Sequence, residues 1–435
     1  MFYVDGERLL RVAMAENEIA PLYIGGEAIA QLCAFVENRY SGQCVTVVAD
    51  SHTYIAAGEA VLQALRNAGI STQVITLPAS GLRADESSLS RVLTRSPVES
   101  SVFIAVGSGT ITDITRYVSY RLGVRFIAFP TAASVDGYAS KGSPLVIDGI
   151  KRTYFAQPPE AIFADREVLA VAPPELTAAG FGDLLGKTTS IADWRLGTLV
   201  RDELFDEGIA MRVTAAVDRC LSVIDSIAQR DPKGLLTLFG SLTETGLCMI
   251  GFGDSQPASG SEHHVSHVWE MLTIKNQQSS QTALHGAQVG IATAFSARIY
   301  EKLRALNVTD VEKLFYNRLP LSRQNQEREI KMLFGDIGNI IVNEHKEYLE
   351  LTDEQQLGIA DRVIKCWPEI QKIATSVPRA ESITRFLEAV GSPTDPYVLG
   401  MRPSDVDAGI RGGHYLRNRF TVAKLAHMMG ILVDQ

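Results

Sequence analysis

The feature that most constrains the fold of this chain is an alternation, over its first 170 residues, of short β-branched apolar runs with amphipathic stretches of ten or more residues. Such alternation is typical of βαβ units, in which helices connect the neighbouring strands of a parallel sheet. Because most of the apolar runs are nearly continuous, we expect the strands to be buried on both faces. The predicted strands are residues 44–49, 73–77, 101–106, 125–129 and 161–164. The predicted helices are residues 28–37, 54–67, 86–94 and 112–121, with Gly69 and Gly123 as C-terminal stops.

The rest of the chain has a different pattern. After residues 171–174 (VAPP) the strand signal disappears and apolar residues recur at helical spacing. Loops are expected at residues 255–260 and 393–403. These patterns predict an α/β, Rossmann-like domain with a parallel sheet over residues 1–170, followed by an all-α domain over residues 171–435.

The charge balance limits the classes of partner. The chain has 41 basic and 50 acidic residues, a formal net charge of −9, and no run of more than two Lys or Arg. This disfavours binding to nucleic acid or to an anionic membrane surface. Because Asp5 and Glu7 lie where a signal peptide would be basic, and no 18-residue apolar stretch exists, we expect a cytoplasmic protein. Five cysteines without a CxxC spacing favour reduced thiols. We expect a small-molecule substrate and a homo-oligomer, with a homodimer as the working form.

A glycine pair follows the third predicted strand. Gly107, Gly109 and Thr110 lead from this strand into a helix. Glycine lets the backbone approach a pyrophosphate closely, and the free N–H groups of a helix start form an anion site. An ordinary tight turn explains the pair equally well, and Asp113 is also a typical first-turn acid favoured by the helix dipole.

Two further segments of this half are typical of a ligand site. Residues 129–137 leave a predicted strand and place Thr131 and Ser134 near Asp136, with small side chains that leave room for a bound molecule. Asp50 ends the first predicted strand, where many dinucleotide-binding folds have an acid that bonds a ribose hydroxyl. The alternative for Asp50 is an ordinary strand-terminal aspartate.

Four of the eight histidines fall within residues 263–285. His263 and His267 have the i, i+4 spacing that places two imidazoles on one helix face, whereas His264 is rotated from His263 by about 100°. His285 follows in a separate segment. Imidazoles with a carboxylate bind zinc, nickel or iron, and three protein ligands leave a position open for a substrate oxygen. The alternative is a polar patch on an exposed helix.

Asp183 is the candidate carboxylate ligand. It lies in the apolar, glycine-rich segment GFGDLLGK, where a buried carboxylate needs a partner. A helix N-cap is the alternative. For Glu262, beside the histidines, an ordinary helix-surface acid is favoured over a ligand.

The C-terminal region has weaker candidates. A solvated basic face is favoured over an anion site for Arg402, Arg411, Arg417, Arg419 and His414. His345 and His427 have no ligand-type partner and are expected to be structural. A Ser/His/Asp hydrolase is disfavoured because no GxSxG elbow follows a strand.

Five motifs carry a resemblance to a known family. GSGTITD, FPTAASVDGYAS, GFGDLLGK, SEHHVSH and LHGAQVG occur in this order and resemble the sn-glycerol-1-phosphate dehydrogenases. These belong with the iron-containing alcohol dehydrogenases, glycerol dehydrogenases and dehydroquinate synthases. The resemblance is clear over about residues 20–300 and loose beyond. The segment between His263 and His285 is longer than in archaeal members, which indicates an insertion within residues 269–282.

The resemblance implies the following roles. The pyrophosphate of NAD or NADP would be bound by Gly107, Gly109, Thr110 and Asp113. Thr131, Ser134 and Ser140 would line the rest of the cofactor site, and Asp50 would contact the adenosine ribose. One divalent metal ion, zinc, nickel or iron, would be held by Asp183, His263 and His285. The substrate would be contacted by Asp136, Asp183 and His267.

The activity that the resemblance implies is the reversible reduction of dihydroxyacetone phosphate to sn-glycerol 1-phosphate. A metal ion would act as a Lewis acid on the substrate oxygen, and His267 or a water would exchange the proton. Lys187 or the C-terminal arginines would contact the phosphate. The alternatives are a dehydrogenase of uncharged glycerol or alcohols, and a dehydroquinate synthase-like sugar-phosphate cyclase, against which Asp183 in place of Glu argues. A non-catalytic binding module is disfavoured because the ligand candidates and glycine turns are all retained.

Overall fold

The structure, a computed structural model, describes residues 2–4, 7–8, 19–275 and 283–432. By packing, the described chain divides into two compact units. The first contains the residues up to Leu184 and residues 218–253, and the second contains residues 185–217 and those from Asp254 onward. The chain therefore crosses between the units more than once. The sequence predicts two functional domains, residues 1–170 and 171–435, and this division stays a prediction.

The first unit is built on one sheet with the order β2-β1-β3-β10-β7-β6-β4-β5. All neighbours are parallel except β1 and β2. The strands of the sheet are β1 (Phe2–Val4), β2 (Glu7–Arg8), β3 (Leu22–Gly25), β4 (Cys44–Asp50), β5 (Ser71–Leu77), β6 (Ser100–Gly107), β7 (Arg125–Pro130) and β10 (Ile162–Asp165). The five predicted strands and the parallel sheet are confirmed.

Five strands of this unit were not predicted, namely β1, β2, β3, β8 and β9. β3 is only four residues long, too short for a clear periodic signal. A separate hairpin joins β8 (Gly142–Ile147) to β9 (Ile150–Phe155). Asp148 and Gly149 form its turn with φ values of 53° and 74°. An Asp-Gly pair between two apolar runs is the signal that would have predicted this hairpin.

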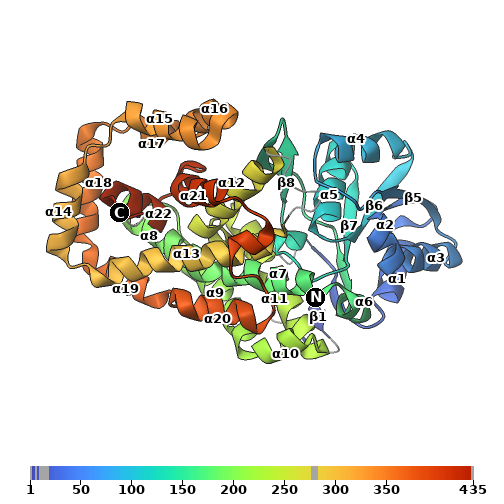
Figure 1. Ribbon diagram of the computed structural model, residues 1–435. Helices are drawn as coiled ribbons and strands as arrows, with labels where there is room; N and C mark the ends of the chain where they lie inside the picture. The colour runs from blue at the N-terminus through green and yellow to red at the C-terminus, as the bar shows by residue number, and fades with distance from the viewer. Residues whose placement is uncertain (1, 5–6, 9–18, 276–282, 433–435) are drawn as a thin grey trace. The chain divides into compact units, whose positions relative to one another are not determined.

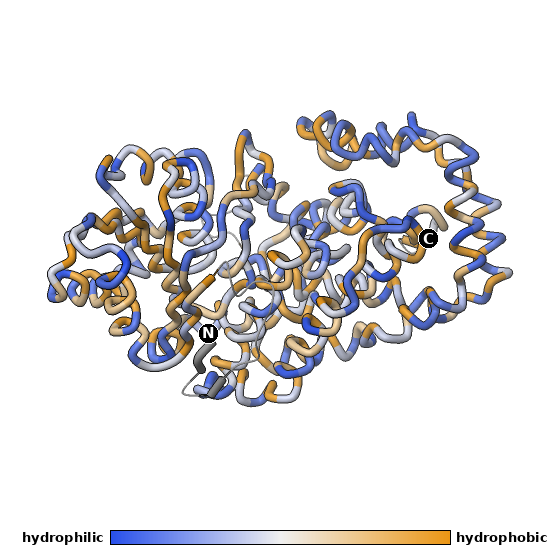
Figure 2. The backbone as a smooth tube through the Cα atoms, turned by 180° about the vertical axis from the view of Figure 1, so that it is seen from behind, coloured by the Kyte–Doolittle hydropathy of each residue, from blue (hydrophilic) through white to orange (hydrophobic). Residues whose placement is uncertain are grey.

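Helices cover both faces of the sheet (Figure 1). α1 and α3 pack on one face against alternate residues of β4 and β6, and α4 and α5 lie on the other. The strands are mostly apolar (orange in Figure 2) because both faces are covered. Gly123 ends α5 in the left-handed conformation, as predicted. The helices and turns of this unit up to residue 184 are α1 (Ala28–Tyr40), α2 (Ser51–Thr53), η1 (Tyr54–Gly58), α3 (Glu59–Asn67), α4 (Glu86–Arg95), α5 (Gly109–Leu122), η2 (Gly137–Ala139), α6 (Arg166–Val171) and α7 (Pro174–Leu185).

Two more helices complete the first unit, α10 (Ile224–Gln229) and α11 (Pro232–Phe252). Among the described residues, α11 is the one helix long and apolar enough to cross a membrane, and 67% of its apolar window is buried within the protein. A Cβ atom on Gly246 would lie 2.6 Å from the Asp136 carbonyl oxygen. α11 is therefore packed backbone to backbone against the loop that precedes η2, which is the position of a core helix.

The described residues of the second unit contain helices and no strands, as the periodicity predicts. Trp269 of α12 is fully buried against Ile291 and Val406, and a Cβ atom on Gly409 would lie 2.2 Å from its Nε1. This packing fixes α12 (Ser261–Lys275) against α13 (His285–Ala305) and α21 (Pro403–Gly412). The predicted loops at 255–260 and 393–403 contain only the short turns η3 (Gln256–Ala258) and η5 (Pro396–Leu399) before α21 begins.

The remaining helices, of which α9 spans the boundary at Val217, are α8 (Lys187–Arg201), α9 (Glu207–Ser222), α12 (Ser261–Lys275), α13 (His285–Ala305), α14 (Val308–Arg318), α15 (Arg323–Phe334), η4 (Gly335–Ile337), α16 (Gly338–Glu344), α17 (Lys346–Leu349), α18 (Asp353–Lys365), α19 (Trp367–Ser376), α20 (Ala380–Ala389), α21 (Pro403–Gly412), η6 (Gly413–Tyr415) and α22 (Val422–Met429).

Candidate cofactor and metal sites

The predicted glycine turn lies between β6 and α5 in the first unit. β6 ends at Gly107 and α5 begins at Gly109, with Ser108 as an extended N-cap whose side chain makes no capping hydrogen bond. The first turn of a helix has N–H groups without partners in the helix itself. Without a side-chain cap, these groups can bind an anion such as a pyrophosphate.

The second predicted turn packs directly on the first. The Thr131 N–H donates to the Gly107 carbonyl oxygen at 3.2 Å. A Cβ atom on Gly109 would lie 2.9 Å from Cγ2 of Val135, and one on Gly107 would lie 2.6 Å from Cβ of Ile111. The two glycines are thus required by the packing of the protein itself, in addition to any need for a ligand to approach.

Arg116, which the sequence analysis missed, holds these turns together. Its buried guanidinium donates to Oδ1 of Asp113 at 2.8 Å and to the carbonyl oxygens of Gly137, Tyr138 and Gly142 at 2.6–3.1 Å. Burial raises the pKa of Asp113 to about 7, and Arg116 opposes the rise. The Asp113 carboxyl group is therefore already engaged, and its contact with a cofactor stays a prediction.

The other predicted cofactor residues also make internal bonds. Asp50 caps α2, because its Oδ1 accepts the N–H groups of His52 and Thr53 at 2.8 and 2.9 Å. The Ser134 hydroxyl lies 3.0 Å from the Tyr138 hydroxyl. The Ser140 hydroxyl donates to the carbonyl oxygens of Gly137 and Gly142. Contacts of Asp50, Thr131, Ser134 and Ser140 with a cofactor stay predictions.

Asp183 lies in the last turn of α7, so the alternative of an N-cap is wrong. Its side chain is almost fully buried, and its Oδ2 accepts the Asp136 N–H at 3.0 Å. A Cβ atom on Gly180 would lie 1.9 Å from the Ala133 carbonyl oxygen. Glycine at position 180 therefore lets α7 lie directly on the second turn, which brings two predicted substrate residues, Asp136 and Asp183, together.

Three of the four clustered histidines face one another in the second unit. His263 and His267 come from α12 and His285 begins α13. The ring centroid of His285 lies 5.4 Å from those of both His263 and His267, which are 6.2 Å apart. The ring of His263 is buried, so the alternative of an exposed polar patch is wrong. His264 is buried too, and neither of its ring nitrogens has a hydrogen-bond partner.

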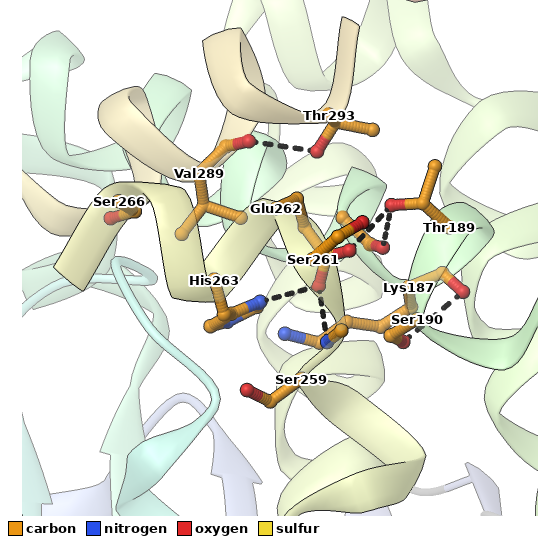
Figure 3. A network of polar contacts seen from close by, with 12 residues as sticks. Lys187, Thr189, Ser190, Ser259, Ser261, Glu262, His263, Ser266, Val289 and Thr293 are labelled. Atoms are coloured by element: carbon orange, nitrogen blue, oxygen red, sulfur yellow. Dashed lines mark hydrogen bonds and ion pairs between the residues drawn. The ribbon is translucent and has the colours of Figure 1, made fainter. Parts of the chain in front are cut away.

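Each of the two predicted metal-binding histidines is held by a buried glutamate. Oε1 of Glu262 lies 2.8 Å from Nδ1 of His263 (Figure 3). Oε1 of Glu270 lies 3.0 Å from Nδ1 of His285. A metal-binding histidine commonly donates its second N–H to a carboxylate, which fixes the tautomer and leaves Nε2 for the metal. The two histidine–glutamate pairs are therefore suited to bind a divalent metal ion through Nε2 of each histidine.

Glu262 is not the surface acid that the sequence favoured. It is fully buried, and its second carboxylate oxygen accepts the hydroxyl of Thr189 at 2.7 Å while Oε1 also accepts the Gly260 N–H (Figure 3). These bonds and His263 hold the pKa of Glu262 below its usual value against the effect of burial. Glu270 was missed because nothing in the sequence distinguishes it from other helical acids.

His285 also belongs to a second group of possible metal ligands, distinct from the predicted set of Asp183, His263 and His285. His267, Glu270 and His285 offer ligand atoms within 4.8 Å of one another. Oε1 of Glu270 lies 3.0 Å from Nδ1 of His285, which is the position of a carboxylate that orients a metal-binding imidazole. The arrangement favours Glu270 as an orienting residue.

Asp193 of α8, also missed, connects two helices of the second unit. Its Oδ2 accepts the Ser261 N–H at the start of α12, and its Oδ1 accepts the Val422 N–H at the start of α22, each at 2.7 Å. The Tyr300 hydroxyl donates to the same Oδ1 at 2.6 Å. One buried carboxylate thus sets the position of the histidine-bearing helix relative to the C-terminal helix.

The predicted basic face at the C-terminus is wrong for two of its members. Arg419 is buried and donates to the Ser259 carbonyl oxygen at 3.0 Å and to Asp254 at 2.7 Å. His414 is also buried. Arg402 is exposed, as predicted, and pairs with Asp405.

Comparisons with known proteins agree with the fold. The model of the iron-containing alcohol dehydrogenase family matches residues 23–173. A glycerol-1-phosphate dehydrogenase (NAD(P)+) of Halalkalibacterium halodurans is 35% identical over 93% of this chain and 91% of its own length. The enzyme of that name from Bacillus velezensis is 41% identical over 66% of this chain and 73% of its own length. The crystal structure of glycerol dehydrogenase from Schizosaccharomyces pombe has a TM-score of 0.59 at 15% identity, covering 95% of this chain and 89% of that one. The chain therefore belongs to the glycerol-1-phosphate dehydrogenase family and has the fold of the iron-containing alcohol dehydrogenases.

Proposed function

We propose that this protein is a metal-dependent, NAD(P)-linked dehydrogenase that reversibly reduces dihydroxyacetone phosphate to sn-glycerol 1-phosphate. The observation that carries the proposal is the pair of buried glutamates on Nδ1 of His263 and His285. Such pairs leave both Nε2 atoms available as ligands. Membership of the family, whose relatives bear this enzyme's name, supplies the substrate.

The proposed metal ligands are Asp183, His263 and His285. Asp183 is a buried carboxylate that the bond from the Asp136 N–H holds in place, and a fixed carboxylate oxygen is a common ligand of such ions, which supports a ligand role. When bound, zinc, nickel or iron supplies Lewis acidity to the substrate oxygen, and the nicotinamide supplies the hydride. The chain's own task is to fix the distance and orientation of these groups.

His267 is the proposed proton-exchanging residue. Its ring lies on the same helix face as His263, one turn further along α12, and 5.4 Å from the ring of His285. A histidine near its ordinary pKa can both donate and accept a proton at neutral pH. Asp136 is proposed to contact the substrate, because the bond from its N–H to Asp183 fixes it beside a proposed ligand.

The start of α5 is the proposed site for the NAD or NADP pyrophosphate. Its support is the absence of a side-chain cap at Ser108 and the packing of Gly109 against the second turn. Thr131, Ser134 and Ser140 belong to that turn, and Asp50 ends the neighbouring strand β4. We propose a cytoplasmic homo-oligomer without nucleic-acid or membrane partners, for which the net charge of −9 is the support.

One enzyme assay tests the proposal. Purified protein with a divalent metal should oxidise NADH with dihydroxyacetone phosphate at least tens of times more efficiently than with dihydroxyacetone, since each charge-assisted hydrogen bond contributes about 1.5–3 kcal/mol and about 1.4 kcal/mol is a factor of ten. A dehydrogenase of uncharged substrates would show no such difference. The product should not be oxidised by an sn-glycerol-3-phosphate oxidase, and a strong signal with that oxidase would overturn the stereochemical assignment.

A further inference from the structure

Five basic side chains gather inside the second unit, in addition to the three histidines that face one another. They come from α12, from the junction of α16 and α17, from η6 and from α22, and each is at most 6% exposed. We call them the basic cluster: His264, His345, His414, Lys424 and His427.

The members of the basic cluster contact one another. Nζ of Lys424 lies 2.6 Å from Nε2 of His345. The rings of His414 and His427 are stacked with centroids 4.1 Å apart, and the centroids of His345 and His414 are 6.5 Å apart. His264 lies close enough to depress the pKa values of His345 and His414. A single anion could therefore contact several of them.

Five ring nitrogens of the basic cluster lack a hydrogen-bond partner among the described residues. Both ring nitrogens of His264 and of His414, and Nδ1 of His345, are buried without a hydrogen bond. Within the part of the chain that the structure describes, no ion pair of Lys424 with a carboxylate is found, and its Nζ lies 4.8 and 5.0 Å from the ring centroids of Tyr348 and Tyr415. Buried polar groups in native proteins are almost always hydrogen-bonded, so these donors indicate a missing ligand.

The charge of the cluster selects the class of that ligand. A lysine and a nearby arginine, Arg419, would repel a cation, and the described histidines of the cluster form no convergent ligand group with a carboxylate or thiol. Lysine and histidine N–H groups are donors, and a lysine is a common binder of phosphate as a point charge. The ligand should therefore be an anion with several acceptor oxygens.

We propose that the basic cluster binds the phosphate group of the substrate, with Lys424 and His414 as its principal donors. The inference rests on the proposed function. His264 adjoins His263 in α12, so this helix joins the basic cluster to the proposed metal-binding histidines. Asp193 bonds the first turns of both α12 and α22, which sets the distance between His264 and Lys424.

The test uses Lys424→Met with Lys302→Met as a matched control. Lys302 is a partly buried lysine of the same unit whose Nζ donates to the Ile431 carbonyl oxygen at 3.1 Å. Thermal unfolding of the metal-loaded protein is followed with and without millimolar inorganic phosphate, in the presence of saturating NADH so that the proposed pyrophosphate site at the start of α5 is occupied. Wild-type protein and Lys302→Met should be stabilised by phosphate, and Lys424→Met should not.

A second measurement compares substrates. The ratio of kcat/KM for dihydroxyacetone phosphate to that for dihydroxyacetone should fall at least tenfold in Lys424→Met and stay within twofold of wild type in Lys302→Met. His414→Phe should lower the ratio, and His414→Gln, which keeps an N–H donor, should restore part of it. These two variants provide the same comparison if Lys424→Met does not fold.

The outcomes separate this inference from the proposed function. Phosphate stabilisation that persists in both Lys424→Met and His414→Phe overturns the inference, whatever the enzyme reduces. No stabilisation of wild-type protein by phosphate overturns it as well. If phosphate stabilises wild-type protein and not Lys424→Met, but dihydroxyacetone phosphate is not reduced, the site stands and the proposed reaction is wrong.

Discussion

Oε1 of Glu270 lies 3.0 Å from Nδ1 of His285, and Oε1 of Glu262 lies 2.8 Å from Nδ1 of His263. Two histidines from different helices thus have the same arrangement, in which a buried glutamate fixes the ring and Nε2 points away from it. Because the two pairs come from α12 and α13, the packing of these two helices sets the distance between the imidazoles.

The first prediction concerns the orienting glutamates. Glu270→Gln should weaken metal binding by about 10–100-fold, since loss of an orienting partner typically has this effect. Metal affinity can be measured by competition with a chromogenic chelator. Glu244→Gln, on α11 in the first unit, is the control and should keep wild-type affinity. Equal affinities of Glu270→Gln and wild-type protein would refute the orienting role.

The second prediction distinguishes the adjacent histidines. His263→Ala and Asp183→Asn should lose bound metal, whereas His264→Ala should keep it, because the ring of His263 alone of this pair is paired with Glu262. Elemental analysis after mild chelation measures the metal directly. Loss of metal from His264→Ala with retention in His263→Ala would reverse the assignment.

The third prediction tests the close approach of α7 to the second turn. Gly180→Ala would place a Cβ atom 1.9 Å from the Ala133 carbonyl oxygen, so the helix must move. We expect a loss of about 1–3 kcal/mol in the free energy of unfolding and a large loss of activity. Gly358→Ala, at an exposed position of α18 where the added Cβ atom has nothing within 4 Å, should instead stabilise the protein by up to about 1 kcal/mol. Chemical denaturation would measure both.

The fourth prediction concerns the cofactor. Gly109→Val should weaken NAD(P)H binding, measured by fluorescence titration, because the added side chain meets Val135 and obstructs the start of α5. Metal content should be unchanged and serves as the control for folding. Wild-type cofactor affinity in this variant would show that the pyrophosphate binds elsewhere.

The fifth prediction is a pH dependence of stability. Burial holds the pKa of Lys424 well below its usual value, and Glu329 only partly opposes this. Between the folded pKa and about 10.4 the unfolded chain binds more protons, so the stability of the ligand-free protein should rise with pH. Burial also lowers the pKa values of His345, His414 and His427, which face Lys424. These histidines change the stability only up to about neutral pH, because above it they are deprotonated in the unfolded chain as well.

Comparison with Lys424→Met isolates this contribution. From pH 7.5 to 10, wild-type protein should gain stability relative to Lys424→Met, as measured by urea denaturation at each pH. At pH 7.5, Lys424→Met should be at least as stable as wild-type protein, because it removes a lysine that must lose its proton on folding at this pH. Parallel curves for the two proteins would contradict the assigned pKa shift.

The sequence by itself determined the parts of this protein that depend on local patterns. Near-continuous apolar runs predicted the strands of the parallel sheet, and Gly123 predicted the end of α5. The i, i+4 spacing of His263 and His267 placed both on one face of α12, because helical periodicity alone fixes that relationship.

Only the tertiary structure decided which polar groups are buried and what they contact. In the sequence Glu262 resembles an ordinary surface acid, whereas in the structure it is buried and accepts a hydrogen bond from Thr189 of α8. The basic cluster unites His264 with Lys424, 160 positions later, and no local pattern links residues so far apart. The assignment of residues 218–253 to the first unit also depends on contacts between segments far apart in the sequence. Burial and pairing arise from contacts between distant segments, and a local pattern contains no information about them.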